Sequence, residues 1–268
     1  MKVAQRLAAA VLVLIYVAAL GAGWFAPAGY AAQFRENPGA PPSSRFLLGT
    51  DELGRDAFAR LLYGSRVSLS LAPAAALVST LIAAAVGIIA GYFGGWVDTL
   101  LMRLADLFLS VPWLFLILTV RAVMPLNVSP VESIGITFLL LGMLGWAAGA
   151  RVVRSTALSL ESRDFMIQAR ARGCGHLRLL IVHLLPNLRP VVAAQFWMSI
   201  PIFILSEANL GFLGLGVAEP LPSWGNLLAG LQSLDTLTAS PWRLAPLALL
   251  VLVMTCFHLV VPMEEFSK

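Results

Sequence analysis

Charged side chains gather in one stretch of this chain, Arg151–Pro190 (the island), which lies between two long apolar runs. Ser162 is placed to cap a helix, and Asp164 then falls in the first turn, where a negative charge is favourable beside the helix dipole. Arg170 falls in the last turn, and Gly173 suits the left-handed conformation that ends many helices. The spacing therefore predicts a helix of about nine residues, roughly 13 Å long, whose chemistry is electrostatic and apolar binding.

The predicted helix is too short to be stable alone, so it needs a surface to pack against. Its apolar part comes from Phe165, Ile167, Ala169 and Ala171. Two surfaces fit a short basic helix of this kind: anionic lipid headgroups, on which it would lie flat, or a groove of a soluble partner protein. The residues alone leave both alternatives open. A second helical run, His176–Leu185, leads to Pro186, which is expected to stop or kink it.

The composition places the island in a membrane protein. The chain of 268 residues is 59% hydrophobic and 12% charged, with a mean hydropathy of +0.85, which excludes an ordinary soluble domain. The predicted fold class is all-α, a polytopic membrane protein with six transmembrane helices, because six apolar segments are long enough to cross about 30 Å of hydrocarbon. These segments are Leu7–Phe25, Val67–Phe93, Val97–Val120, Ile134–Val153, Val191–Leu210 and Pro241–Pro262, and the second, fifth and sixth contain Pro73, Pro201 and Pro246, each a potential kink.

Lysine and arginine predict the orientation. Positive charges favour the cytoplasmic side, and their distribution favours cytoplasmic N- and C-termini, with the island on the same side. The first apolar run is longer than that of a signal peptide, so we expect an uncleaved first helix. The predicted organisation is a first transmembrane helix with an extracytoplasmic loop (1–66), a five-helix core (67–262) that includes the cytoplasmic loop 154–190, and a short cytoplasmic tail (263–268).

A few charges outside the island are candidates for contacts. Arg103 and Asp106, one helical turn apart, are expected to pair with each other. Glu207 lies near the outer end of the fifth segment, where it either faces a path through the membrane or pairs with an outer-loop arginine. Thr50 or Asp51 is placed to cap a short helix. The candidates for a path, or for outer contact with another protein, are Asp51, Glu52, Arg55, Asp56, Glu207 and Trp224, with solvated capping charges as the alternative for the first four.

The sequence lacks the motifs of several enzyme classes. It contains no GxxxxGK[ST] phosphate loop, and its lysines, Lys2 and Lys268, do not follow a glycine. It has no HExxH zinc site and no GxSxG nucleophile elbow, and its three histidines lack the spacing of metal ligands. We therefore expect no catalysis, no metal and no nucleotide cofactor on this chain, so that any ATP-driven work would use another polypeptide.

The island resembles a loop of a known transporter family. The order Ala169, Ala171, Gly173, followed by HLLPN at His183–Asn187, resembles the EAA loop of ABC-importer permeases. The stretches Leu47–Leu71 and Ser206–Ala229 resemble the peptide/nickel-type permeases, specifically the "C" subunit of dipeptide and oligopeptide importers. The resemblance extends from about Leu47 to about Trp242, and its three separated motifs occur in the family's order.

This resemblance implies an ABC type I importer permease fold with a cytoplasmic coupling helix, which seats in a cleft of an ATP-hydrolysing subunit. The partners it implies are a homologous second permease subunit, two ATP-binding cassette subunits that carry ATP and Mg, an extracytoplasmic substrate-binding protein and membrane lipid, with no nucleic acid. The implied location is a bacterial or archaeal cytoplasmic (inner) membrane. The implied coupling residues are Arg163, Asp164, Phe165, Ile167, Gln168, Ala169, Arg170, Ala171, Gly173 and Pro186.

The function implied by the resemblance is transport of di- or oligopeptides through a path of which this chain forms half. Alternatives are an importer of nickel, metal chelates or other small solutes, and, from other classes, a secondary transporter or a membrane scaffold. The chain departs from the family's pattern at Ile167 and Gln168, where glutamate and alanine are usual, and at Arg172, where an apolar residue is common. Its C-terminal segment also lacks the family's usual Gly-Asp-rich tail.

Overall fold

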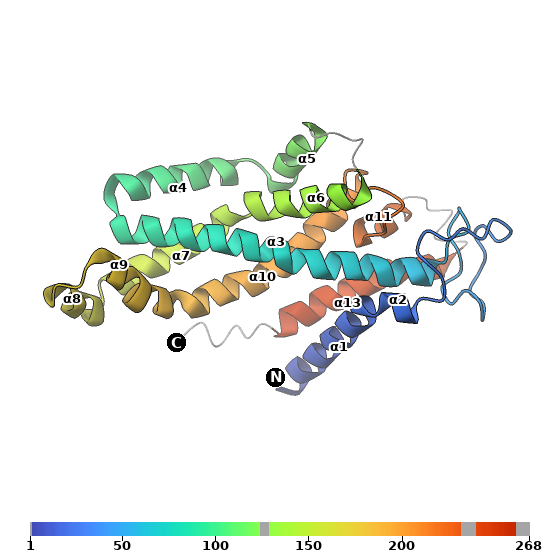
Figure 1. Ribbon diagram of the computed structural model, residues 1–268, viewed down its shortest axis with the longest axis horizontal. Coiled ribbons are helices and arrows are strands. Elements are labelled where there is room, and N and C mark those ends of the chain that lie inside the picture. Colours follow the sequence, from blue (N-terminus) through green and yellow to red (C-terminus); the bar gives the residue numbers. More distant parts are fainter. Residues whose placement is uncertain (1, 124–128, 232–239, 261–268) are drawn as a thin grey trace. The chain divides into compact units, whose positions relative to one another are not determined.

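The computed structural model describes residues 2–123, 129–231 and 240–260, and it is built from helices (Figure 1). Within these ranges the only extended pairing is at two isolated β-bridges, Gln33–Arg55 and Thr50–Asp56, so the all-α prediction is confirmed. The helices are α1 (Lys2–Leu20), α2 (Ala22–Phe25), α3 (Ala57–Phe93), α4 (Gly95–Ser110), α5 (Trp113–Val123), α6 (Pro130–Leu144), α7 (Trp146–Glu161), α8 (Asp164–Ala171), α9 (His176–Arg178), the π-helix η1 (Leu179–Leu184), α10 (Leu185–Phe212), α11 (Trp224–Ala229), the 3₁₀-helix η2 (Pro241–Leu244) and α13 (Ala245–Val260).

Five helical stretches of the described chain are long and apolar enough to cross a membrane: Val3–Leu20, Ala57–Phe93, Pro130–Glu161, His176–Phe212 and Pro241–Val260. A sixth span is formed if α4 and α5 are taken as one, although they are bent by 85° at the break between them. The predicted continuous helix Val97–Val120 is therefore wrong. Its break falls at Val111, which has an extended backbone (φ −92°, ψ 128°) because the following Pro112 disfavours the helical conformation.

The start of α3 differs from the prediction. No separate short helix follows Thr50 or Asp51, because the turns from Ala57 onward already belong to α3. The capping side chain is Asp56, whose Oδ1 accepts a hydrogen bond from the Phe58 backbone N–H at 2.9 Å. Burial raises the pKa of the Asp56 carboxyl above its ordinary value, against the hydrogen bonds from Phe58 and Ala59, which lower it.

Two compact units make up the structure. Unit 1 contains Met1–Ala72, Val120–Phe138 and Pro201–Val261, and unit 2 contains Pro73–Thr119, Leu139–Ile200 and Pro262–Lys268. The long helices α3 and α10 pass from one unit to the other at Pro73 and Pro201, both of which lie inside continuous helices. Pro246 instead falls in the first turn of α13, a position at which proline is well tolerated because the first N–H groups of a helix have no partner within it. The predicted tail 263–268 lies outside the described residues.

In unit 1, α1 and α13 lie side by side (Figure 1). Their buried residues recur at helical spacing, as expected for two apolar helices that pack along their length. These residues are Leu12, Ile15 and Ala19 on α1, and Leu250, Val253 and Phe257 on α13. The first predicted segment is therefore an integral part of this unit.

In unit 2, α3 and α7 approach so closely that only glycine fits on α3. A Cβ at Gly87 would lie 2.7 Å from the Ala150 carbonyl oxygen, and a Cβ at Gly91 would lie 2.7 Å from the Ala157 Cβ. The two glycines are four residues apart, which puts them on one face of the helix. Small residues at this spacing allow helix backbones to pack closely in a membrane, where van der Waals contact is a main source of helix association.

A Gly91→Ala substitution is expected to destabilise the purified protein, because its new methyl group would force α3 and α7 apart. We expect about 1–3 kcal/mol of overpacking cost, partly offset by the better helix propensity of alanine, which is worth about 1 kcal/mol. The matched control is Gly135→Ala in α6, where no atom lies within 4 Å of the new Cβ, so only the propensity gain remains. Thermal unfolding in detergent measures both, and equal unfolding temperatures for the two variants would contradict the close packing.

Candidate functional site

The island contains a short helix, as the sequence predicts. Helix α8 has eight residues, with Asp164 in its first turn and Arg170 in its last. The predicted cap is wrong, because Arg163 is the N-cap residue and the Ser162 hydroxyl donates to the Ser159 carbonyl instead. Gly173 has φ +77°, which confirms the left-handed conformation expected after the helix.

The two faces of α8 have different surroundings. Met166 and Ala169 are 0% and 5% exposed, whereas Phe165 and Ile167 are 36% and 54% exposed. Met166 and Ala169 belong to an apolar cluster that α8 shares with α3, α7, η1 and α10, and its other buried members are Tyr92, Val153, Ala157, Leu179, Leu184 and Leu188. Ala169 therefore packs α8 against other helices of the same chain. The side chains open to a partner are those of Arg163, Asp164, Phe165, Ile167, Gln168, Arg170, Ala171 and Arg172.

Pro186 does not stop the second helical run of the island. Helix α9 continues into η1 and then into α10, in which Pro186 is the second residue. The Leu185 N–H donates to the Leu180 carbonyl five residues earlier, which is the wider hydrogen-bond pattern of a π-helix. Proline has no N–H and its ring crowds the preceding turn, so a local widening lets the chain continue without breaking.

Ion pairs tie α7 to α4, which pack against each other in unit 2. Arg151 pairs with Asp106, and Arg154 pairs with Asp98 through two guanidinium nitrogens. The predicted pair of Arg103 with Asp106 is therefore wrong. Helix α7 lies alongside α4 and brings an arginine from a different helix to Asp106, which spacing along one helix cannot reveal.

In unit 1, four charged side chains form a connected ion-pair network. They are Asp51 and Arg55 in the loop before α3, Arg60 in α3 and Glu219. Arg55 Nε lies 2.6 Å from Asp51 Oδ2, and Arg55 Nη1 lies 2.7 Å from Glu219 Oε2. Arg60 Nη2 lies 2.8 Å from Glu219 Oε1, and the Arg60 side chain is only 4% exposed. Each carboxylate thus receives hydrogen bonds from a guanidinium group, which satisfies charges that are partly removed from water.

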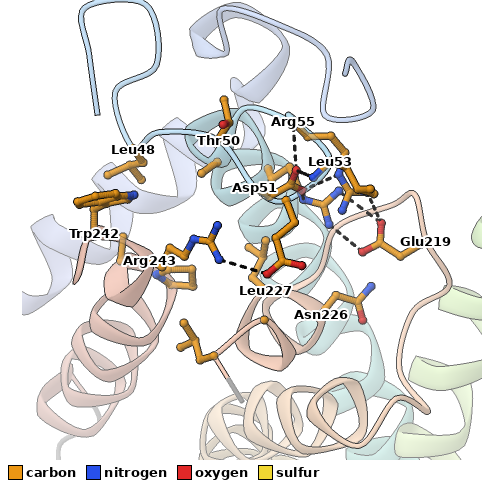
Figure 2. Close-up of a pocket in the computed structure, with 17 residues that line it drawn as sticks. Leu48, Thr50, Asp51, Leu53, Arg55, Glu219, Asn226, Leu227, Trp242 and Arg243 are labelled. Carbon is orange, nitrogen blue, oxygen red and sulfur yellow. Dashed lines mark hydrogen bonds and ion pairs between the residues drawn. The ribbon is translucent and has the colours of Figure 1, made fainter. Parts of the chain in front are cut away.

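This network borders a cavity of about 450 Å³ in unit 1 (Figure 2). The wall comes from three segments: the loop before α3, residues 219–231, and the start of α13 with η2. Figure 2 shows Trp242 beside Leu48. Arg243 Nη1 lies 3.5 Å from Glu52 Oε1. Asp51, Glu52 and Arg55 line the cavity, whereas Asp56 does not line it and is 2% exposed.

Glu207 and Trp224 are both covered by unit 1 itself, each with 0% exposure. The Ser68 hydroxyl donates to Glu207 Oε2 at 3.1 Å, so its partner is a serine of α3 and not an outer-loop arginine, one of the two alternatives that the sequence left open. The Trp224 indole N–H donates to Ser65 Oγ at 2.9 Å, and its backbone N–H donates to Ser68 Oγ at 3.2 Å. In this structure the two side chains fasten α10 and α11 to α3 and face neither an open path nor the outer solvent.

Sequence reasoning missed several of these residues. Arg60 and Glu219 are 159 positions apart, and Tyr92 and His176, which form a hydrogen bond, are 84 apart. Separations of this size leave no periodic pattern. Among the described residues, no three histidine, cysteine, aspartate or glutamate side chains come together as a metal site.

Loss of the Glu219 carboxylate is expected to destabilise unit 1. In Glu219→Ala, the buried Arg60 keeps Asp51 at 3.7 Å as its carboxylate neighbour and a long hydrogen bond to the Pro220 carbonyl at 3.5 Å, so we expect a loss of about 2 kcal/mol and a drop in unfolding midpoint of about 5 °C. Glu52→Ala is the matched control, because the Glu52 side chain is 78% exposed and its pair with Arg243 is long. We expect a change of at most about 2 °C for it. Thermal unfolding of the two purified variants measures the difference, and similar midpoints would argue against the network.

Comparison with known proteins shows which family the chain is similar to. A family model described as "Binding-protein-dependent transport system inner membrane component" matches residues 83–262, which include the island. The chain is 34% identical over 251 residues to the oligopeptide transport system permease protein OppC of Bacillus subtilis (strain 168), covering 93% of this chain and 80% of that protein. It is 37% identical over 220 residues to OppC of Mycobacterium tuberculosis (strain H37Rv), covering 82% and 74%. It is 38% identical over 225 residues to the di/tripeptide transport system permease protein DppC of Pseudomonas aeruginosa (strain UCBPP-PA14), covering 81% and 72%.

Proposed function

This chain belongs to the family of binding-protein-dependent transport system inner membrane components, and we propose that it is one permease subunit of an ATP-driven importer of di- or oligopeptides. The observation that supports peptides as the substrate is the similarity, over most of the chain, to permeases named for oligopeptides and di/tripeptides. The permease itself supplies helices and contact surfaces. The ATP and Mg that drive transport belong to the ATPase subunits.

We infer that α8 is the coupling helix that docks with an ATPase subunit. Its inward face is occupied by its own chain through Met166 and Ala169, and its outward face presents Phe165 and Ile167. Exposed apolar side chains on a helix of eight residues favour a protein groove, in which both become buried. Lipid headgroups alone are the alternative, and a copurified ATPase subunit would separate the two.

We further propose the orientation and the remaining partners. The arginines of the island favour its location on the cytoplasmic side, an orientation in which both termini also face the cytoplasm. Six spans of this chain pair with those of a homologous second permease, and two ATPase subunits engage the two coupling helices. An extracytoplasmic binding protein delivers the peptide to the side that carries Asp51, Glu52 and Arg55, whose cavity is accessible in unit 1.

The decisive experiment is reconstitution of the permease pair, the ATPase subunits and the binding protein in lipid vesicles. With ATP on the cytoplasmic face, we expect uptake of labelled trialanine, and no uptake without the binding protein. A nickel salt, supplied under the same conditions, is expected to remain outside. Uptake of nickel without uptake of any di- or tripeptide would contradict the proposed substrate class, and absence of a bound ATPase subunit would contradict the proposed type of transporter.

A further inference from the structure

Two aromatic side chains at the end of α3 hold the residue that begins α9. Tyr92 Oη lies 2.7 Å from His176 Nδ1, so the two side chains form a hydrogen bond, in which the hydroxyl donates when His176 carries its proton on Nε2. The two rings meet edge to face with centroids 5.8 Å apart, and the ring of Phe93 stacks on His176 at 6.5 Å. His176 is thereby held by two consecutive residues of α3.

The same tyrosine also contacts α8. The guanidinium of Arg170 lies over the Tyr92 ring, 5.7 Å from its centroid, and pairs with Glu161, the last residue of α7. Tyr92 is 6% exposed and belongs to the apolar cluster under α8. One side chain of α3 therefore contacts residues on both sides of the turn 172–175, which joins α8 to α9.

The turn 172–175 is held to α8 by backbone hydrogen bonds, from the Gly173 N–H to the Arg170 carbonyl at 2.9 Å and from the Cys174 N–H to the Ala169 carbonyl at 3.1 Å. A Cβ added at Gly173 or at Gly175 would meet no atom within 4 Å, so the two glycines do not pack against a neighbouring element. Along the chain, a displacement of α8 reaches α9 through this turn alone. The contacts of Tyr92 with Arg170 and His176 bypass the turn and lead from α8 and α9 directly into α3.

We propose that Tyr92 and His176 are positioning residues that carry the displacement of α8 into α3, an inference that rests on the proposed function of α8 as the coupling helix. The hydrogen bond is directional and the rings are held by packing, so the three elements move together. Tyr92 and His176 do not lie on the outward face of α8. Their role is to deliver the motion to α3, in addition to α7 and α10, which precede and follow α8 along the chain.

The test measures trialanine taken up per ATP hydrolysed in vesicles that hold the complete transporter. Tyr92→Phe removes the hydroxyl and keeps the ring, so the apolar cluster and the contact of the Arg170 guanidinium with the ring remain, whereas the interactions of the hydroxyl with His176 and with Arg170 are both lost. His176→Asn places an amide oxygen near the position of Nδ1 and keeps an acceptor, whereas His176→Gln extends past it. We expect Tyr92→Phe and His176→Gln to lower the ratio roughly threefold or more, His176→Asn to retain most of it, and the double variant Tyr92→Phe/His176→Gln to be no lower than either single variant.

A wild-type ratio in Tyr92→Phe, or losses that add in the double variant, would overturn the inference, because the two side chains would then act separately or not at all. Trypsin digestion of the purified permease shows whether the island keeps its structure. If the island of Tyr92→Phe becomes sensitive to trypsin, the comparison of the two His176 variants decides the question. Equal uptake per ATP for His176→Asn and His176→Gln would contradict the role of Nδ1. A wild-type complex that binds no ATPase subunit would be a failure of the proposed function, which is distinct from an altered ratio in an assembled complex.

Discussion

A Phe165→Ala permease is expected to bind its ATPase subunit roughly tenfold more weakly, and peptide uptake should fall with it. The Phe165 side chain is 36% exposed on the outward face of α8, so a partner's groove would bury the remaining apolar surface. Loss of that burial is worth about 1.5 kcal/mol, and about 1.4 kcal/mol corresponds to a factor of ten in the dissociation constant. Titration of the detergent-purified permease with the ATPase subunit measures the change.

The control for this prediction is Leu177→Ala, which removes another apolar side chain of the island. Leu177 is 71% exposed in α9, outside the proposed coupling helix, so we expect less than a twofold effect on binding. If Leu177→Ala weakened binding as much as Phe165→Ala, the docking surface would extend well beyond α8. If neither substitution changed binding, α8 would not be the docking element.

An Ala169→Asp permease is expected to release α8 from the rest of the chain. Ala169 is 5% exposed within an apolar cluster, and a carboxylate there would lose its hydration without a matching partner. We expect a local cost of at least about 2 kcal/mol, enough to unfold the backbone of α8 locally, so that trypsin can cut at its arginines, and to abolish coupling. Limited trypsin digestion of the isolated permease reports this change without any ATPase subunit present.

Ala171→Asp provides the matched comparison for Ala169→Asp. It introduces the same charge two residues later on the same helix, at an exposed position. The only expected cost is the unfavourable placement of a negative charge near the helix C-terminus, about 0.5 kcal/mol, so trypsin resistance should be retained. Equal protease sensitivity in the two variants would show that α8 does not have the buried and exposed faces described above.

The structure gives the departure at Ile167 a physical meaning. Ile167 is 54% exposed, so it belongs to the surface proposed to meet a partner, and an isoleucine there offers apolar contact where a glutamate would offer charge. Gln168 and Ala171 are exposed beside it. The outward face of α8 is therefore more apolar than the family's usual pattern implies, which is consistent with a large expected effect for Phe165→Ala.

Local patterns in the sequence were sufficient for most of the membrane helices and for α8. Long apolar runs predict spans because the hydrocarbon core requires every backbone group to be satisfied within the helix. The end of α8 was also predictable, since Gly173 has the positive φ that glycine adopts without strain. The bend between α4 and α5 had a visible signal in Pro112, although the apolar run continues across it.

The sequence by itself therefore determined the class of protein, the course of most helices, the place of the short helix α8 and the family resemblance, because each depends on neighbouring residues. Only the tertiary structure decided which face of α8 is free, that Asp106 pairs with Arg151, that Arg60 pairs with Glu219, and that Tyr92 meets His176. These partners lie far apart in the chain. Their meeting depends on which helices pack together and at what rotation, and the close approach at Gly87 and Gly91 shows how a single missing methyl group can govern that packing.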